Sequence, residues 1–332
     1  MPKVSVIIPT YNRAHLVAES IQSVLDQTFT DFEIIVVDDG STDNTKEVVD
    51  AFRDQRIRYT YQENQGVVVA SNRGFELSRG EYIALFSSDD ILTENALAKP
   101  VDVLDKHPEV AFSYGQVYLM DRRGHVFDLR KPRSGHSSIR HGIEEITKYL
   151  IWGNHITAAT IMIRRDCLLE VGLFNPAFSS GSEDCDLWIR LAKKYDVAYI
   201  AEPVLKYRVH SANISSARGM DEELKSKSRI LEGIFNDAEL GPLFSPLRSR
   251  AYFRLHVRLA LHAYSGRQMK TAREQLIEAL KIHPGGLFQS MWFYLFIKTL
   301  LPLSVVRSIH RVNRYMRKVT WDIFLRLQTA RK

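Results

Sequence analysis

The stretch IIVVDDGS at residues 34–41 decides the fold, because a fully apolar run passes directly into two acidic residues and a turn. The stretch YIALFSSDD at residues 82–90 repeats this pattern. Short apolar runs of this kind are typical of buried strands in parallel sheets, whose carboxyl ends bind ligands in open α/β folds. Two acidic clusters at one sheet edge would repel each other unless a cation or a donor-rich ligand lies between them. The pattern therefore indicates a nucleotide and a divalent metal.

Strand and helix patterns alternate through the first hundred residues. Apolar residues at positions 17, 21, 24 and 25 have the spacing of a helix packed on a sheet, and Ser41 or Thr42 can cap a second helix. The βαβαβαβ order predicts an α/β fold with a doubly wound, mostly parallel sheet that has helices on both faces. The first four strands are expected at residues 4–8, 33–37, 57–61 and 82–86.

The pattern changes after Pro108. A turn sequence at residues 121–124 separates two strand-like runs, which predicts a hairpin. Residues 130–142 are basic and poor in apolar side chains, so we expect a mobile loop over the site. From about Asp221 onward the pattern is helical. Further strands are expected at residues 110–120, 126–129, 159–163, 197–200 and 204–209.

Composition and charge exclude several classes of protein. The net charge is +6, but residues 307–332 alone hold eight Lys/Arg and one acidic residue, so the rest of the chain is close to neutral and the overall charge does not predict nucleic-acid binding. The two cysteines, Cys167 and Cys185, form no disulfide framework and fit a reducing cytosol. The first residues run straight into a strand, so we expect no secretory signal and a cytoplasmic location.

Six short motifs, each weak alone, occur in a characteristic order: PTYN (9–12), DDGSTD (38–43), NQG (64–66), SDD (88–90), EDCDLW (183–188) and YRVH (207–210). Together they resemble the family 2 glycosyltransferases of GT-A fold, which are inverting enzymes that use nucleotide-sugar donors. The resemblance covers roughly residues 3–215. It implies a catalytic GT-A domain at 1–218, followed by an all-α region at 219–332 with a basic amphipathic tail.

The resemblance implies that the first loop holds the base of the nucleotide, uracil by preference. A plain turn at residues 9–12 is the structural alternative, and turn formation alone would explain Gly40 and Ser41. The family often has Arg where this chain has Ser71, which makes uridine preference less secure. Asp38 is left undecided. The residues implied in nucleotide binding are Pro9, Thr10, Tyr11, Asn12, Asp39, Asn72, Ser88 and Asp89.

The resemblance places a Mn²⁺ or Mg²⁺ ion at Asp89, Asp90 and His210. Such hard cations prefer oxygen ligands, often a few carboxylates together with the phosphates of the substrate. The alternative for Asp90 is that it caps a helix starting near Thr93. The family usually has a further acid where this chain has Ser87, so the site is one carboxylate poorer than is typical.

Glu183 and Asp184 open a predicted helix. Acids at a helix N-terminus are stabilised by about 0.3–1 kcal/mol each, which is a sufficient structural reason for them. The resemblance implies that one of the two, Asp184 in our interpretation, is the general base that accepts a proton from the acceptor hydroxyl. Such assistance contributes about 10²–10⁴ in rate. Direct displacement needs no nucleophile from the enzyme, and no nucleophile pattern is found.

The C-terminal third combines a helix pair with an apolar and then a basic segment. Residues 261–284 resemble one tetratricopeptide-like helix pair, which needs neighbours to bury its face. Residues 287–306 are apolar but contain Lys298 and Pro302, so we favour a helix at an interface over a transmembrane span. Residues 305–327 have the pattern of a basic amphipathic helix. Three interpretations stay open for it: binding to an anionic membrane, a homodimeric coiled coil, and packing on the chain itself.

The sequence thus predicts a metal-dependent, inverting glycosyltransferase that moves a sugar, from UDP by preference, to a saccharide or lipid-linked acceptor on the inner face of the cell membrane. A nucleotidyltransferase is the nearest enzymatic alternative, but it usually has a Gly-rich basic loop after the first strand, and residues 9–13 lack one. A non-catalytic protein that binds nucleotide-sugars is the other alternative.

Overall fold

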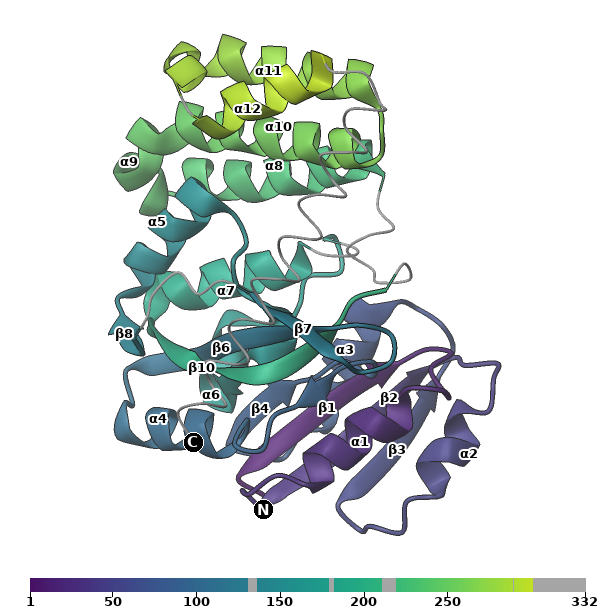
Figure 1. The fold of residues 1–332 in the computed structure, drawn as a ribbon. Helices are drawn as coiled ribbons and strands as arrows, with labels where there is room; N and C mark the ends of the chain where they lie inside the picture. The colour runs from purple at the N-terminus through teal and green to yellow at the C-terminus, as the bar shows by residue number, and fades with distance from the viewer. Residues whose placement is uncertain (131–135, 179–181, 211–218, 289, 301–332) are drawn as a thin grey trace, which may run out of the picture. The chain divides into compact units, whose positions relative to one another are not determined.

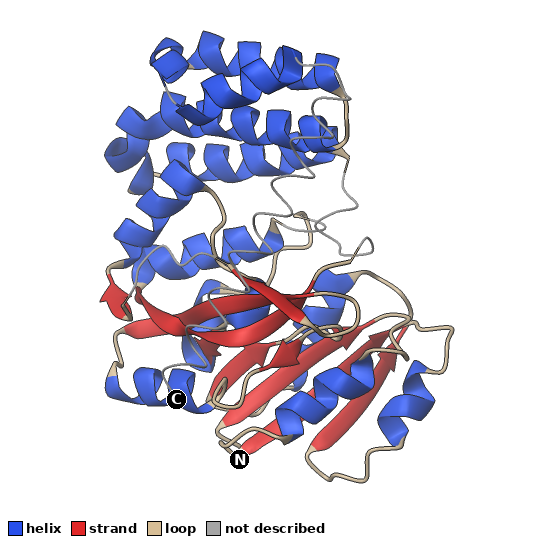
Figure 2. Cartoon of the chain, viewed as in Figure 1, coloured by secondary structure: helices blue, strands red, loops and turns tan. Residues whose placement is uncertain are grey.

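The computed structural model describes residues 1–130, 136–178, 182–210, 219–288 and 290–300 (Figure 1). The chain divides into two compact units. The first comprises residues 1–149 and 154–217, and the second comprises residues 150–153 and 218–332. The first unit is α/β and the second is built from helices (Figure 2).

The first unit begins with four parallel strands in the spatial order β3-β2-β1-β4. Each apolar run expected from the sequence forms a strand, and the two runs that end in acidic residues form β2 and β4. Because all four strands run in the same direction, the acidic residues that end β2 and those that follow β4 lie at the same edge of the sheet. The bounds are β1 Val4–Thr10, β2 Phe32–Asp39, β3 Ile57–Gln62 and β4 Tyr82–Leu85.

Helices cover both faces of this sheet. Alternate residues of β2 point to opposite sides: Ile34 and Val36 pack in a core with Ile21 of α1, whereas Ile35 and Val37 pack with Ala70 of α3. A strand buried on both faces needs a continuous apolar run rather than an alternating one, which explains the pattern of residues 34–37. The predicted doubly wound arrangement is confirmed. The helices are α1 Val17–Leu25, α2 Thr45–Asp50 and α3 Val67–Leu77.

The sheet continues with strands of mixed direction. A short strand, β9, lies antiparallel between β4 and β6, and β6 in turn pairs with β10 in parallel. The strand expected at residues 159–163 starts later than predicted. Residues 158–160 form a 3₁₀ turn, and the strand, β9, begins at Met162. The bounds are β5 Ile91–Leu92, β6 Val110–Met120, β7 Val126–Leu129, β8 Ser138–Arg140, η1 Ala158–Thr160, β9 Met162–Arg164 and β10 Asp196–Arg208.

The prediction of two separate strands at residues 197–200 and 204–209 is wrong, because β10 is continuous. Its register against β6 shifts between Ile200 and Pro203 and again between Pro203 and Leu205. Proline cannot donate to the hydrogen-bond ladder, and a bulge is one of the places where a strand tolerates it. The expected loop at 130–142 also contains β8, which pairs with the start of β10. Residues 131–135 of that loop lie outside the described residues.

Four further helices complete the first unit around the sheet. Helix α5 follows β8, and α7 is packed against β6 through Trp188 and Phe112, whose ring centroids lie 5.5 Å apart. The helices are α4 Ala98–Lys106, α5 Gly142–Trp152, α6 Arg165–Val171 and α7 Glu183–Lys194.

The second unit is a bundle of helices. The expected pair at residues 261–284 corresponds to α10 and α11, and it shares a core with Trp292 and Leu295 of α12. The indole Nε1 of Trp292 donates to the carbonyl oxygen of Leu276 at 2.9 Å. The predicted amphipathic helix at 305–327 lies outside the described residues. The helices are α8 Met220–Asn236, α9 Leu240–Phe244, η3 Ser245–Leu247, α10 Arg248–Ser265, α11 Met269–Ile282, η4 Pro284–Phe288 and α12 Ser290–Leu300.

Within the described part of the chain, no helix combines the length and the apolar character that crossing a membrane requires.

Candidate active site

The first loop, residues 9–12, is tied to the DDGSTD loop by Asn12. The Asn12 side-chain oxygen accepts hydrogen bonds from the backbone amides of Thr42 (2.8 Å) and Asp43 (3.3 Å). The backbone amide of Asn12 donates to the Ser41 hydroxyl (2.9 Å). Asn12 has a φ of 51°, a conformation that asparagine tolerates better than most residues. Pro9 and Thr10 are the last residues of β1, so only Tyr11 and Asn12 of this segment lie beyond the strand, and Tyr11 is 46% exposed. The loop therefore presents an exposed aromatic ring on a fixed backbone.

Asp38, undecided from the sequence, is held entirely by the protein. Its Oδ1 accepts from the Ser41 amide at 2.8 Å, and its Oδ2 accepts from the Tyr59 hydroxyl at 2.7 Å. Burial and the hydrogen bond to this carboxylate raise the pKa of Tyr59. Asp38 is 1% exposed, so its role in this structure is to shape the loop.

Asp39 holds the NQG loop. Its Oδ1 accepts from the Gln62 side chain (2.8 Å) and the Gln65 amide (3.0 Å), and its Oδ2 accepts from the Gly66 amide (2.8 Å). Gly66 has a φ of 90°, which glycine adopts without strain. A carboxylate has about four acceptor sites, so these three bonds leave capacity for one more donor. Recognition of uracil by Asp39 stays a prediction.

Asn72 and Ser88 were both predicted to bind the nucleotide. In the structure, the Asn72 side chain bonds the protein main chain and Ser88 is buried. The Asn72 amide makes two bonds to the backbone of Phe174: its Nδ2 donates to the carbonyl oxygen at 2.8 Å and its Oδ1 accepts from the amide at 3.0 Å. This pair ties α3 to the segment before α7. Ser88 is buried in the turn that follows β4.

Asp89 and His210 are 121 positions apart in the sequence, and the structure brings them together. His210 Nε2 lies 3.1 Å from Asp89 Oδ2. The same oxygen lies 3.8 Å from Nε of Arg13, a residue to which the sequence assigned no function. Asp89 follows β4 and His210 follows β10, so this corner joins the early and late halves of the sheet.

Asp90 is almost fully buried, at 1% exposed. Its Oδ1 accepts from the Arg208 amide at 2.8 Å, whereas its Oδ2 has no hydrogen-bond partner within the described residues. Burial, together with the charge of Asp89, raises the pKa of the Asp90 carboxyl to about 8. The alternative that Asp90 caps a helix near Thr93 is wrong, because strand β5 follows it and the next helix begins at Ala98.

The buried side chain of Arg208 joins the segments that meet at this corner, and no role was predicted for it from the sequence. Its Nε donates to the carbonyl oxygen of Asp89 (2.9 Å), Nη1 to that of Arg122 (3.0 Å), and Nη2 to a Glu19 carboxylate oxygen (2.5 Å). Arginine is rarely buried without partners, and this one is 2% exposed. The signal in the sequence was its place in the YRVH motif at 207–210, within which no role was predicted for the arginine.

The residues at this corner fit a hard divalent cation. No group of three or more His, Cys, Asp or Glu side chains is arranged for a metal among the residues that the structure describes. Asp89 and His210 could supply two ligands, and Mg²⁺ and Mn²⁺ commonly take further oxygens from substrate phosphates and water. Asp90 adds a buried carboxyl group beside them, and one of its oxygens has no hydrogen-bond partner within the described residues.

Glu183 and Asp184 form the first turn of α7, as predicted from the sequence. Glu183 Oε2 accepts from the Ser182 amide at 2.8 Å. Asp184 Oδ1 accepts from the Cys185 amide at 2.7 Å, and its Oδ2 accepts from the side chain of Asn154 at 2.9 Å. Residues 179–181, just before this helix, lie outside the described residues.

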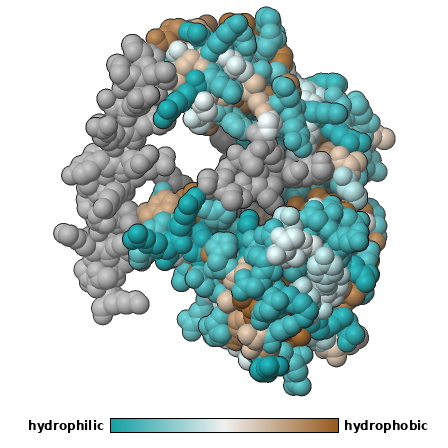
Figure 3. Space-filling view, turned by 90° about the vertical axis from the view of Figure 1, so that its right-hand side faces the viewer, coloured by the Kyte–Doolittle hydropathy of each residue, from teal (hydrophilic) through white to brown (hydrophobic). Residues whose placement is uncertain are grey.

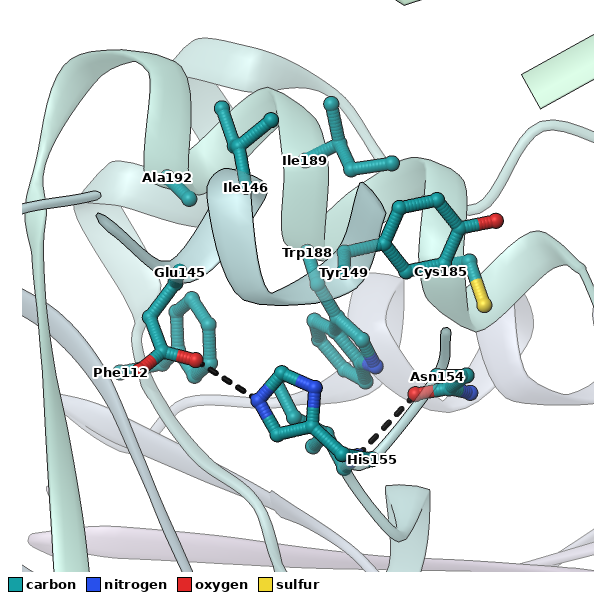
Figure 4. A pocket seen from close by; sticks show the side chains of 11 residues that line it. Phe112, Glu145, Ile146, Tyr149, Asn154, His155, Cys185, Trp188, Ile189 and Ala192 are labelled. Carbon is teal, nitrogen blue, oxygen red and sulfur yellow. Dashed lines mark hydrogen bonds and ion pairs between the residues drawn. The ribbon is translucent and has the colours of Figure 1, made fainter. Parts of the chain in front are cut away.

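A small cavity of about 20 Å³ lies beside this turn, between α5 and α7 (Figure 4). Its wall includes Glu145, a carboxylate that contacts the side chains of Arg140, Lys148 and His155. Burial alone would raise the pKa of Glu145, but the hydrogen bond and charge of His155 and those of Lys148 outweigh it and lower this pKa to about 2. The sequence did not single out this cluster. The cavity is lined by Phe112, Glu145, Ile146, Tyr149, Asn154, His155, Ile156, Cys185, Trp188, Ile189 and Ala192.

Comparison with protein families gives one match that covers just over half of the chain: residues 5–172 match the model of glycosyl transferase family 2. A curated relative is the putative teichuronic acid biosynthesis glycosyltransferase TuaG of Bacillus subtilis. It is 32% identical over 220 residues, which are 65% of this chain and 82% of TuaG. The chain spans only 66% and 51% of the length of two uncharacterized glycosyltransferases, from Rickettsia typhi and Rickettsia conorii, that it also matches.

Two solved structures share the fold at 18% sequence identity. Staphylococcus aureus TarS in complex with UDP-GlcNAc matches with a TM-score of 0.55 over 83% of this chain and 89% of that chain. The mannosyltransferase PcManGT of Pyrobaculum calidifontis, in complex with GDP-Man and Mn²⁺, matches with a TM-score of 0.57 over 90% and 84%. At this identity the likeness supports the fold alone.

Proposed function

The chain belongs to glycosyl transferase family 2, and from this premise we propose that it transfers a sugar from a nucleotide-sugar donor to a hydroxyl group. The acceptor is a saccharide or a lipid-linked saccharide, and the process is the synthesis of a polysaccharide or glycolipid. Transfer proceeds with inversion and depends on Mn²⁺ or Mg²⁺. UDP-sugars are the favoured donors.

The observation that carries this proposal is the Asp89–His210 pair at the carboxyl edge of the sheet. The pair is held by Arg208, whose guanidinium bonds the main chain of Asp89 and whose own amide bonds Asp90. A cation held there by Asp89 and His210 would stabilise negative charge on the departing nucleoside diphosphate. Arg13, beside Asp89, adds a fixed positive charge to the same corner.

Asp184 is proposed as the general base. It accepts a proton from the acceptor hydroxyl while that oxygen forms a bond to the anomeric carbon and the bond to the diphosphate breaks. Both of its oxygens accept one hydrogen bond from the protein, so each keeps a further acceptor site. Glu183, whose carboxylate bonds the Ser182 amide, is the second candidate for the same role.

The preference for UDP rests on the base-binding side of the site. Asp39 has one acceptor site left, which suits the imide N–H of uracil, and the exposed ring of Tyr11 is available for stacking against a base. A guanine base also offers N–H donors, so GDP-sugars belong in the same test.

The experiment is incubation of the purified protein with a panel of UDP- and GDP-sugars and Mn²⁺, with measurement of released nucleoside diphosphate. We expect release that stops with EDTA and falls by about 10²–10⁴ in Asp184→Asn. Release of pyrophosphate would indicate a nucleotidyltransferase instead. Tight binding without turnover, even with an acceptor extract, would indicate a non-catalytic nucleotide-sugar-binding protein.

We further propose that the helical unit attaches to the anionic inner face of the cell membrane, where a lipid-linked acceptor would be found. Phe293, Ile297 and Leu300 recur at spacings of four and three along α12 and are each more than 40% exposed. Apolar side chains are visible along the upper edge of this unit in Figure 3. Eight basic residues follow in the sequence at 307–332, and each contributes about 1 kcal/mol near an anionic surface.

Co-sedimentation with vesicles that contain anionic lipid tests this attachment. The triple variant Phe293→Ser, Ile297→Ser and Leu300→Ser is expected to lose most of its binding. Serine variants of Leu261 and Ile277, which are exposed apolar residues on other helices of the unit, are the matched control. Equal recovery of both variants with the vesicles would reject this surface, and a shift from dimer to monomer in the triple variant alone would indicate a homodimer interface.

A further inference from the structure

We propose that Asn154 is a positioning residue for the general base, and that it holds the carboxylate of Asp184 in the orientation needed to accept a proton. This inference rests on the proposed function, because it assigns a task to a neighbour of the residue proposed as the base. Neither the sequence motifs nor the family resemblance pointed to Asn154, which lies 30 positions before its partner.

The hydrogen bonds around Asn154 fix which end of its amide faces Asp184. Its Oδ1 accepts from the backbone amide of Ile156 at 3.1 Å, so the oxygen is turned toward the main chain. The Nδ2 group is thereby directed at Asp184 and donates to Oδ2 at 2.9 Å. On the other side, Asp184 Oδ1 accepts from the Cys185 amide at 2.7 Å. The carboxylate is held at both oxygens.

This two-point contact matters because the carboxylate of an aspartate otherwise rotates easily. The terminal torsion of Asp is broad and roughly two-fold, in contrast to the narrow wells of aliphatic side chains. A general base works only when its oxygen lies within hydrogen-bond reach of the proton it removes. The Cys185 amide restrains one oxygen, and Asn154 supplies the second restraint, which sets the plane of the carboxylate.

Asn154 is itself anchored by the buried cluster on α5. The next residue, His155, has a side chain that is 6% exposed, and its Nε2 lies 2.8 Å from Glu145 Oε2, as the dashed line in Figure 4 shows. Glu145 in turn contacts Arg140 and Lys148, each at 2.9 Å. The segment that carries Asn154 is therefore held by charged groups that have no part in the chemistry.

The test compares variants that separate the two hydrogen bonds of Asn154. Asn154→Asp keeps the oxygen that bonds the Ile156 amide but replaces the donor that faces Asp184, and Asn154→Ala removes both. The matched control is Asn175→Asp, because Asn175 also accepts from the amide two residues ahead, that of Ala177, at 3.0 Å. The readouts are kcat, the KM for the donor, and the midpoint of thermal unfolding.

We expect kcat to fall about 10-fold or more in both Asn154 variants, the usual scale for one lost hydrogen bond to a charged group. The donor KM should stay within about two-fold, and Asn175→Asp should behave like the wild type. A loss of donor affinity with kcat unchanged would overturn the proposal, and so would an unchanged kcat in Asn154→Asp.

A double-mutant cycle then tests whether Asn154 acts through Asp184. Asp184→Glu retains a carboxylate but moves it one methylene away from the Asn154 amide, so Asn154→Ala should cost less than about two-fold in that background. An equal loss in both backgrounds would show a general structural role and overturn the inference. A wild-type protein that releases no nucleoside diphosphate from any donor, or an Asp184→Asn variant with full activity, would overturn the proposed function instead.

Discussion

Two pairs of adjacent aspartates lie at the same edge of the same sheet, yet their surroundings differ. Asp38 and Asp39 accept five hydrogen bonds from protein donors, all of them neutral. Asp89 instead faces the cationic Arg13 and the imidazole of His210, and Asp90 keeps one buried oxygen without a partner within the described residues. The same residue type in the same strand-end position is thus held by neutral donors in one case, and in the other it faces charged or ionisable groups and keeps one buried oxygen without a partner.

The hydrogen-bond donors around a buried carboxylate indicate whether it serves the fold or a ligand. A buried carboxylate that is fully supplied with donors is stabilised in its charged form and contributes to the fold. A carboxylate that lacks donors costs free energy, and such a cost persists where a ligand compensates it. Substitutions at both pairs, and at a third buried acid, measure whether this difference holds.

The largest effect is expected from Asp89→Ala. Its side chain faces the proposed cation, whereas Arg208 bonds only its main-chain carbonyl, so the turn should survive the substitution. We expect transfer to fall by about 10²–10³, the scale for one group that stabilises developing charge. Calorimetry should also show weaker binding of nucleoside diphosphate with Mn²⁺ and no change in EDTA. Binding that ignores both the metal and the substitution would remove the distinction between the two pairs.

Glu145 is a third buried acid, and its carboxylate contacts the basic side chains of Arg140, Lys148 and His155. Its pKa is lowered to about 2 in the folded protein from an unfolded value of 4.5, so it contributes about 3 kcal/mol of stability above pH 4.5. That contribution is lost as the pH falls from 4.5 to 2. Glu145→Gln should therefore lower the free energy of unfolding by about 3 kcal/mol at pH 7, and by much less near pH 2.

The control for Glu145 is Glu144→Gln, an exposed neighbour in the same helix, which should change the free energy of unfolding by no more than about 0.5 kcal/mol. Denaturant unfolding at several pH values measures both variants. A Glu145→Gln effect that does not change with pH would contradict the role of its charge.

Asp38→Ala tests the structural pair. It leaves the Tyr59 hydroxyl and the Ser41 amide without their acceptor, and we expect the free energy of unfolding to fall by about 2–3 kcal/mol. Asp50→Ala, at an exposed site paired with Lys46, should change it little. Metal-dependent affinity for nucleoside diphosphate should be unchanged in the folded protein. A loss of that affinity would make Asp38 functional after all.

The smallest effect is expected from Tyr59→Phe, which removes one of the two donors of Asp38. Unfolding by denaturant should show a loss of about 1–2 kcal/mol, because a buried carboxylate oxygen is left without its partner. Tyr61→Phe is the control, since that side chain is 58% exposed. Equal effects of the two variants would mean that the hydrogen bond to Asp38 contributes nothing.

The early strands could be predicted because each is a continuous apolar run that ends in polar residues, and the structure confirms all four. Strand β9 could not be placed, because three residues carry no periodic signal and its antiparallel position depends on pairing with β4 and β6. The continuity of β10 was hidden by Pro203, which normally argues against a central strand.

The candidate site shows the same limit. Asp89, His210 and the Glu183–Asp184 pair could be named, since each stands in a local motif of reactive side chains. Arg208 lies in the YRVH motif but was given no task, and Asn154 lies in no motif, because both make their contacts with residues 119 and 30 positions away. Side chains that position others leave little local pattern, so a sequence read without a structure finds reactive groups more easily than their supports.

The irregularity of β10 around Pro203 has a consequence for how this protein tolerates change. Successive side chains of a strand face opposite ways, so the extra residues of β10 between Ile200 and Leu205 set which way the residues after them face. That phase buries Arg208, leaves Val209 45% exposed, and brings His210 to Asp89. Deleting one residue at 202 would exchange these directions and take the arginine out of its corner. Substitutions that keep the chain length leave this phase unchanged, whereas inserting or deleting one residue between Pro203 and His210 would turn these side chains to the opposite face.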